Sequence, residues 1–82
     1  MKIYTPDEEI NKLFLALSKH RTMHTDNVLL ARRIGSRYKD LVDKDILDIA
    51  YSHKKHRTWF IVPSDVELKH RNDRKYEFIK LF

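Results

Sequence analysis

The sequence predicts one α+β domain in which three N-terminal helices precede a small antiparallel β-sheet or hairpin. Its 82 residues lie within the size range of a single domain. Apolar residues recur at helical spacing as far as His53, whereas the sequence after Arg57 alternates with the two-residue period of strands. No linker or low-complexity segment divides the chain, so we expect residues 1–82 to form one unit.

The first helix is expected over residues 6–20. The segment Thr5-Pro6-Asp7-Glu8 supplies a capping residue, a proline suited to the first helical position and acids in the first turn. The apolar residues that follow at helical spacing are Ile10, Leu13, Phe14 and Leu17. This pattern predicts a helix with one buried face.

Two further helices are expected before residue 55. Thr25 can cap a second helix over residues 26–34, and Gly35 can supply a left-handed stop. An apolar stripe from Tyr38 to His53 then predicts a third helix that ends near residue 54. The pattern leaves two starts open for this helix, which therefore covers residues 37–54 or 41–54.

The last third of the chain predicts three strands, over residues 58–62, 66–70 and 76–82. The first is β-branched and aromatic and ends at Pro63, and Asn72-Asp73 suits a tight turn between the other two. We expect Trp59 and Phe78 inside this sheet. The core expected from all inner faces consists of Ile10, Leu13, Leu17, Leu30, Ile34, Leu41, Ile46, Ile49, Ile61, Phe78 and Leu81.

The spacing of Ala31, Gly35 and Leu41 resembles the helix-turn-helix pattern of DNA-binding proteins. With a helix before it and a hairpin after it, the chain over residues 6–82 is similar to a winged-helix domain. That resemblance implies that the helix after the turn enters the major groove and that the hairpin tip touches the backbone or minor groove. The chain departs from the pattern at Ser36 and Lys44, where apolar residues are usual.

The helix after the turn also begins with an acidic segment, residues 40–45, which would repel phosphates. The acids in this segment are Asp40, Asp43 and Asp45. We therefore expect contacts with the nucleic-acid backbone rather than base reading in the major groove.

The distribution of charge points to an anionic partner. The net charge is +5, and basic blocks over residues 19–39 and 53–82 flank an acidic block over residues 40–52. Cations and one tyrosine from these blocks are the candidate nucleic-acid-binding residues, expected to share one phosphate-binding surface for DNA or RNA: Arg32, Arg33, Arg37, Tyr38, Lys39, Lys54, Lys55, Arg57, Arg71, Arg74 and Lys75. Tyr38 and Trp59 could stack on unpaired bases, and core packing is the alternative for both.

Several classes of site are not expected. The absence of cysteine excludes disulfides, thiolate zinc sites and thiol nucleophiles, and favours a cytoplasmic location. The longest apolar run, Leu13–Leu17, is too short to span a membrane. The histidine pairs at residues 20 and 24 and at residues 53 and 56 lack further ligands, so we expect no metal or other cofactor. No catalytic motif is present; a small nuclease with a histidine base among cations is the enzymatic alternative.

The leading hypothesis is a small regulator that binds DNA or RNA. The alternative is a phage-type or mobile-element-type protein that binds and modulates another protein, including a toxin–antitoxin component or inhibitor. In that case the acidic face over Asp40–Asp48 would be the docking surface. The sequence leaves open whether the chain forms a homodimer.

Overall fold

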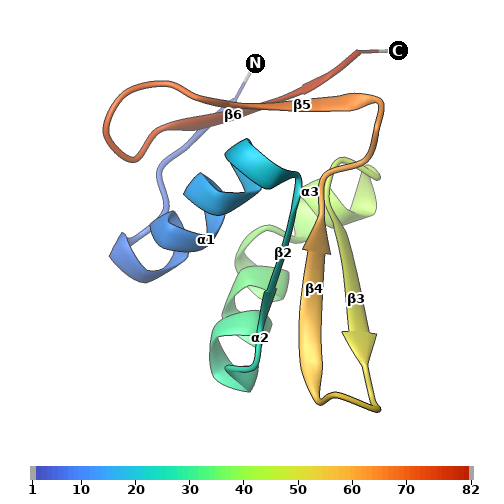
Figure 1. Cartoon of the computed structure of the whole chain (residues 1–82). Coiled ribbons are helices and arrows are strands. Elements are labelled where there is room, and N and C mark those ends of the chain that lie inside the picture. The colour runs from blue at the N-terminus through green and yellow to red at the C-terminus, as the bar shows by residue number, and fades with distance from the viewer. Residues whose placement is uncertain (1, 82) are drawn as a thin grey trace.

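The computed structural model describes residues 2–81, in which helices and strands are interleaved along the chain (Figure 1). The elements of this part of the chain are β1 (Ile3–Tyr4), α1 (Glu8–His20), β2 (Thr22–Thr25), α2 (Val28–Arg37), α3 (Lys39–Asp43), β3 (Asp48–Ser52), β4 (Arg57–Ile61), β5 (Val66–His70) and β6 (Tyr76–Lys80). The strands form two three-stranded antiparallel sheets, with the strand orders β1-β6-β5 and β2-β4-β3. In Figure 1 the first sheet lies at one end of the molecule, and the β3–β4 hairpin points toward the opposite end.

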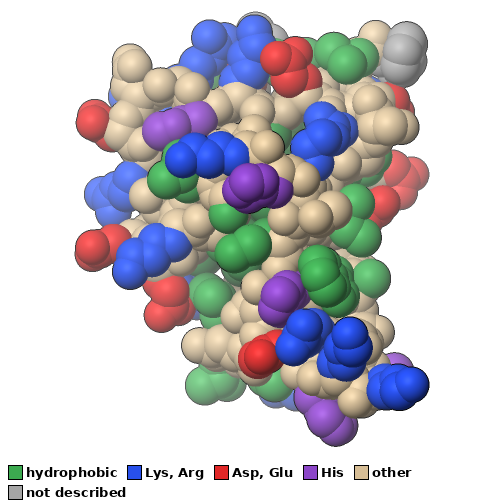
Figure 2. Space-filling model, viewed as in Figure 1, with side chains coloured by type: hydrophobic (Ala, Val, Ile, Leu, Met, Phe, Trp, Pro, Cys, Tyr) green, Lys and Arg blue, Asp and Glu red, His purple; other side chains and the backbone are tan. Residues whose placement is uncertain are grey.

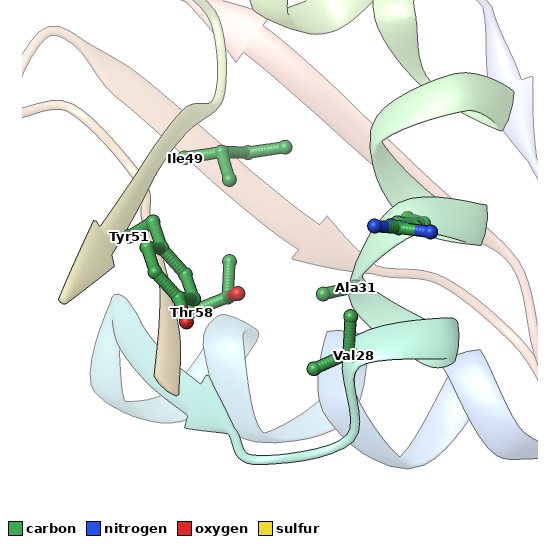
Figure 3. A pocket seen from close by; sticks show the side chains of 6 residues that line it. Val28, Ala31, Ile49, Tyr51 and Thr58 are labelled. Atoms are coloured by element: carbon green, nitrogen blue, oxygen red, sulfur yellow. The ribbon is translucent and has the colours of Figure 1, made fainter. Parts of the chain in front are cut away.

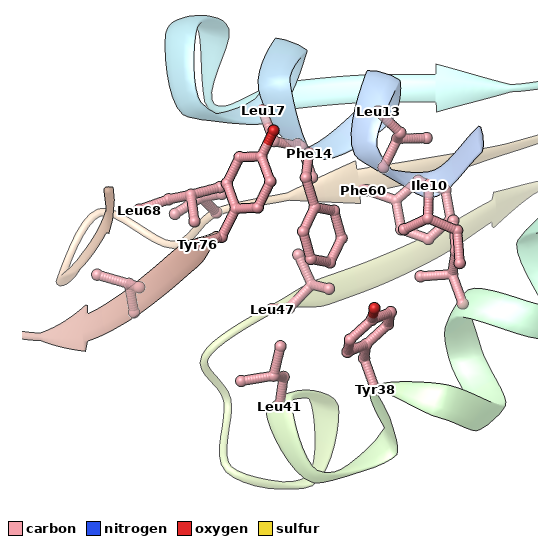
Figure 4. Packing of buried hydrophobic residues seen from close by; sticks show 13 residues of the cluster. Ile10, Leu13, Phe14, Leu17, Tyr38, Leu41, Leu47, Phe60, Leu68 and Tyr76 are labelled. Carbon is pink, nitrogen blue, oxygen red and sulfur yellow. The ribbon is translucent and has the colours of Figure 1, made fainter. Parts of the chain in front are cut away.

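One hydrophobic core joins the helices to both sheets (Figure 4). Phe14 of α1 lies at its centre, with ring centroids 5.0 Å from Tyr38 and 5.5 Å from Tyr76. The Tyr76 hydroxyl donates a hydrogen bond to Oδ1 of Asn11, 2.6 Å away, so the phenol is not left unsatisfied at the core boundary. The buried apolar residues are Ile10, Leu13, Phe14, Leu17, Ile34, Tyr38, Leu41, Leu47, Phe60, Val62, Val66, Leu68 and Tyr76.

Helix α1 begins two residues later than expected. Asp7, not Thr5, caps it, because its carboxylate accepts a hydrogen bond from the backbone N–H of Ile10 at 3.0 Å. The helix ends at His20, and the next residue, Arg21, caps it with a left-handed backbone at φ 66°. This residue turns the chain directly into a strand.

The expectation of three consecutive helices followed by a single sheet is wrong, because β2 lies between α1 and α2. Residues 22–25 pair with β4 over their whole length, with Thr22 opposite Ile61 and Thr25 opposite Thr58. The partner strand lies more than thirty residues away in the sequence. Local pattern alone therefore did not predict this strand.

Helix α2 also has different ends from those expected. Asn27 caps it by accepting from the Leu30 N–H at 3.0 Å, whereas the Thr25 hydroxyl accepts from the Asn27 N–H at 3.1 Å. Gly35 lies inside the helix with a negative φ, so it is not the left-handed stop. A Cβ atom there would meet Ile49 Cδ1 at 3.8 Å, an ordinary contact.

The third helix is far shorter than the expected 37–54 or 41–54. It covers Lys39–Asp43, and Asp45 then takes a left-handed conformation with φ 56°. Residues 48–52 form β3 instead of continuing the helix, with Ile49 opposite Phe60 in β4. The apolar stripe fits both a helical and a two-residue period, and pairing with β4 decides between them.

The three C-terminal strands lie close to their expected positions. They cover residues 57–61, 66–70 and 76–80, and residue 82 of the expected last strand lies outside the described part of the chain. Trp59 is only half-buried, and Leu81 is 52% exposed, although both were expected inside. Leu47 and Phe60 are fully buried although the expected core omitted them.

Candidate nucleic-acid interface

The β3–β4 hairpin projects from the body of the protein and carries a cationic tip. Its strands pair in register from Asp48 opposite Ile61 to Ser52 opposite Arg57. The hairpin tip, defined as residues 53–56, connects them, and its last residue, His56, has φ 52°. The tip lies at the end of the molecule remote from the β1-β6-β5 sheet (Figure 1).

All four side chains of the hairpin tip are exposed: His53, Lys54, Lys55 and His56. Among residues 2–81, neither lysine forms an ion pair. Figure 2 shows Lys, Arg and His side chains gathered at this end of the molecule. Two adjacent ammonium groups without carboxylate partners are free to bind an anion.

Arg57 extends the cationic surface from the tip onto β4. Its side chain is 26% exposed, and its Nε lies 3.3 Å from a carboxylate oxygen of Asp26, which is 65% exposed. This nitrogen is buried and has no hydrogen bond of good geometry within the described residues. The pair with Asp26 therefore leaves hydrogen-bonding capacity on the guanidinium unused.

Alternation along β4 gives the hairpin two different faces. Thr58 and Phe60 are buried against the core, so Arg57, Trp59 and Ile61 point to the other side. We call this other side the outer face of the β2-β4-β3 sheet. On it the Trp59 indole contacts the His24 imidazole of β2, with ring centroids 4.6 Å apart.

On the inner face, an open groove of about 360 Å³ separates α2 from the hairpin (Figure 3). Val28 and Ala31 lie on the helix side, and Ile49, Tyr51 and Thr58 lie on the strand side. The groove is completed by Arg32, an exposed cation of α2. Arg32 thus belongs to the same end of the molecule as the hairpin.

The other two arginines of α2 are engaged with acids at the start of α1. Arg33 lies 3.4 Å from Asp7 and 3.0 Å from Glu9, and Arg37 lies 3.6 Å from Asp7. The pKa of the Asp7 carboxyl is below its ordinary value, first because the Ile10 N–H donates to it and then because these arginines are close. These cations join α2 to α1 rather than forming a free surface.

Two more of the expected site residues have structural partners. Tyr38 is buried in the core at 4% exposure, and burial raises the pKa of its hydroxyl. Lys39 donates to Asp43 at 2.9 Å, and this hydrogen bond raises the pKa of the lysine. Core packing is therefore what the structure shows for Tyr38.

The remaining expected cations lie at the turn between β5 and β6, which we call the far turn (residues 71–75). Figure 1 places it at the opposite end of the molecule from the hairpin tip. Arg71 donates from Nε and Nη2 to one carboxylate oxygen of the buried Glu77, at 3.0 and 2.5 Å. Arg74 and Lys75 are exposed. The structure thus divides the expected single surface into two separate cationic ends.

In the acidic segment Asp40–Asp48, Asp40 has partners from the N-terminal part of the chain. The carboxylate of Asp40 accepts from the Tyr4 hydroxyl at 2.6 Å and lies 3.7 Å from the Lys2 ammonium. These contacts hold the pKa of Asp40 below its ordinary value, with the hydrogen bond from Tyr4 as the larger cause. Asp45 and Asp48 remain exposed.

Sequence reasoning missed two features of this end of the molecule, the Trp59–His24 pair and the groove beside Arg32. The pair depends on β2 and the groove on β3, and the sequence pattern predicted neither segment as a strand. The burial of residues 22–25 does not alternate and their hydrogen bonds come from β4, so the local pattern carried no clear strand signal.

Comparison with protein-family models, curated proteins and solved structures found no match. Among residues 2–81, no helix combines the length and apolar character needed to cross a membrane. Within the same residues, no three His, Asp or Glu side chains gather as ligands for a metal ion.

Proposed function

We propose that this protein binds nucleic acid through the β3–β4 hairpin and acts as a small regulator. The observation that carries the proposal is the pair of exposed lysines at the projecting tip, Lys54 and Lys55, which form no ion pair among the described residues. Arg57 and Arg32 lie on the two sides of the same hairpin. Their combined charge suits the phosphate backbone, which dominates the affinity of such proteins.

The hairpin, rather than α3, is the contact that we propose. Helix α3 has five residues, begins with Lys39-Asp40, and its only lysine, Lys39, is paired with Asp43. A helix this short and this acidic is poorly suited to reading the major groove. A projecting cationic hairpin can follow a backbone by charge alone, without base identity.

The salt dependence of binding follows from the number of cations. If the four cations named above each neutralise one phosphate, log affinity falls against log salt with a slope of about −3.6 on duplex and about −2.8 on single strands. A slope near zero would contradict backbone binding.

The deciding experiment compares charge reversals at the two ends of the molecule. We expect Lys54→Glu with Lys55→Glu to weaken binding of a labelled oligonucleotide by at least about tenfold, measured by fluorescence anisotropy. The matched control is Arg74→Glu with Lys75→Glu at the far turn, which changes the net charge equally. Both pairs are exposed, so circular dichroism should show unchanged folding. Equal loss in both variants, or no loss in the first, would contradict the hairpin as the site.

A further inference from the structure

The outer face of the β2-β4-β3 sheet has the composition of a surface on which bases can stack. The central strand presents Arg57, Trp59 and Ile61 along one line. In the cross-strand row through Trp59, His24 lies on one side and Ala50 on the other. None of these five residues is buried, and Ala50 is exposed. In Figure 2 hydrophobic, His and Lys/Arg side chains lie next to one another over β2 and β4.

Trp59 is not part of the hydrophobic core. The core lies on the opposite side of β4, where Phe60 is fully buried. The indole contacts the imidazole of His24 at a ring-centroid distance of 4.6 Å and an interplanar angle of 50°. On its other side the cross-strand neighbour is Ala50, a small residue that is itself exposed. The indole remains partly exposed, and this exposed part is the surface that a flat partner can meet.

We infer that this outer face is a stacking platform for unpaired bases, and that the ligand is single-stranded nucleic acid. The inference rests on the proposed function and names its substrate class. Aromatic rings beside a cationic track are how proteins hold single strands, because every base offers a flat face. Here the track consists of Arg57 on the platform and the lysines of the hairpin tip beyond it. Arg57 and Trp59 are two residues apart in β4, so they lie on the same face of the sheet with about 6.8 Å between their Cα atoms.

A duplex cannot use this platform in the same way. Its bases are paired and stacked inside the helix, so only phosphates would reach the sheet. Two carboxylates, Asp26 beside Arg57 and Asp48 opposite Ile61, border the same face. They reduce the net attraction for a densely charged duplex, whereas stacking on Trp59 is insensitive to charge.

Trp59 is the only tryptophan in the chain, so its fluorescence reports on this platform directly. The probes are oligothymidylate and oligouridylate of about 12 nucleotides, within the size range of single-strand sites, and a mixed-sequence DNA duplex of equal length. We expect both single strands to quench the emission and to bind at least about tenfold more tightly than the duplex. Tighter binding of the uridylate would identify RNA as the preferred strand, and tighter binding of the thymidylate would identify DNA.

Variants separate stacking from charge. Trp59→Leu should weaken single-strand binding by about tenfold, and Ala50→Leu, at the exposed position opposite Trp59, should also weaken it by filling the space beside the indole without changing the charge. The matched control is Tyr51→Leu, because Tyr51 is an aromatic residue of the same hairpin that is 47% exposed on the inner face. It should change single-strand affinity by less than about twofold.

The failures of the two proposals are distinguishable. Binding that is lost in the Lys54/Lys55 reversal but unaffected by Trp59→Leu and Ala50→Leu, and without fluorescence change in the unmodified protein, would overturn the platform and leave the hairpin function standing. A duplex that binds as tightly as the single strands would also overturn the platform. Absence of binding to all three probes would overturn the proposed function itself.

Discussion

The Tyr4 hydroxyl donates a hydrogen bond to a carboxylate oxygen of Asp40, 2.6 Å away, and so ties the N-terminal strand β1 to helix α3. Burial and this carboxylate raise the pKa of Tyr4, and the hydroxyl in turn lowers the pKa of Asp40. The ring of Tyr4 also packs edge-on against Tyr38 and Phe78. The bond therefore stabilises a junction between the edge of one sheet and the helices.

Removing this hydroxyl should destabilise the protein in a pH-dependent way. Because the folded pKa of Asp40 is depressed, its contribution is complete at neutral pH and is lost as pH falls through the folded value. We expect Tyr4→Phe to reduce the free energy of unfolding by about 1 kcal/mol at neutral pH, and by less in acid. Urea denaturation at several pH values measures the difference. A difference that grows as pH falls would contradict the assigned bond.

Two adjacent residues that follow α3, Ile46 and Leu47, differ in how deeply they are buried. Leu47 is fully buried, whereas Ile46 is only partly buried against the core. We expect Leu47→Ala to cost about 2–5 kcal/mol and Ile46→Ala about 1 kcal/mol, because less apolar surface is lost. A domain of about 5 kcal/mol total stability would then be largely unfolded in the first variant. Equal melting temperatures for the two variants would show that the register of this segment is wrong.

The pair of Arg71 and Glu77 should matter for stability rather than for binding. Glu77 is 1% exposed, so Arg71→Ala leaves a buried carboxylate without its partner. Because Arg71 is about half exposed, we expect a cost of about 2 kcal/mol, below that of a fully buried pair. Thermal unfolding measures this loss, and Arg74→Ala, at an exposed position of the same turn, is the control. A melting temperature unchanged by Arg71→Ala would contradict the structural role.

The carboxylate of Asp26 should weaken nucleic-acid binding through its contact with Arg57. Asp26→Asn removes this competing charge, and we expect affinity to rise by about two- to fivefold at low salt. Stability should fall by no more than about 1 kcal/mol, because the Asp26 carboxylate is 65% exposed although Arg57 is largely covered. Anisotropy titration checks this, with Asp73→Asn at the far turn as a control of equal charge change. Equal gains in both variants would mean that only net charge matters.

The charge pattern and the C-terminal strands could be predicted locally. Alternation after Arg57 is strong enough to predict β4, and helix α1 follows from the spacing of Ile10, Leu13 and Leu17. The lysines of the tip stand out as part of a basic block. Which of the cations remain free could not be predicted, since Arg33 finds its partners in a different helix.

The sequence by itself determined the α1 stripe, the strong strand β4 and the excess of positive charge, because each depends on neighbouring residues. Only the tertiary structure decided that residues 22–25 and 48–52 are strands, since both gain their hydrogen bonds from β4. That pairing ended the third helix after Asp43, placed Trp59 beside His24 and set the hairpin tip at the opposite end of the molecule from the far turn. Backbone groups that are unsatisfied in an isolated segment take the partner that the fold supplies, and here the partner was distant in sequence.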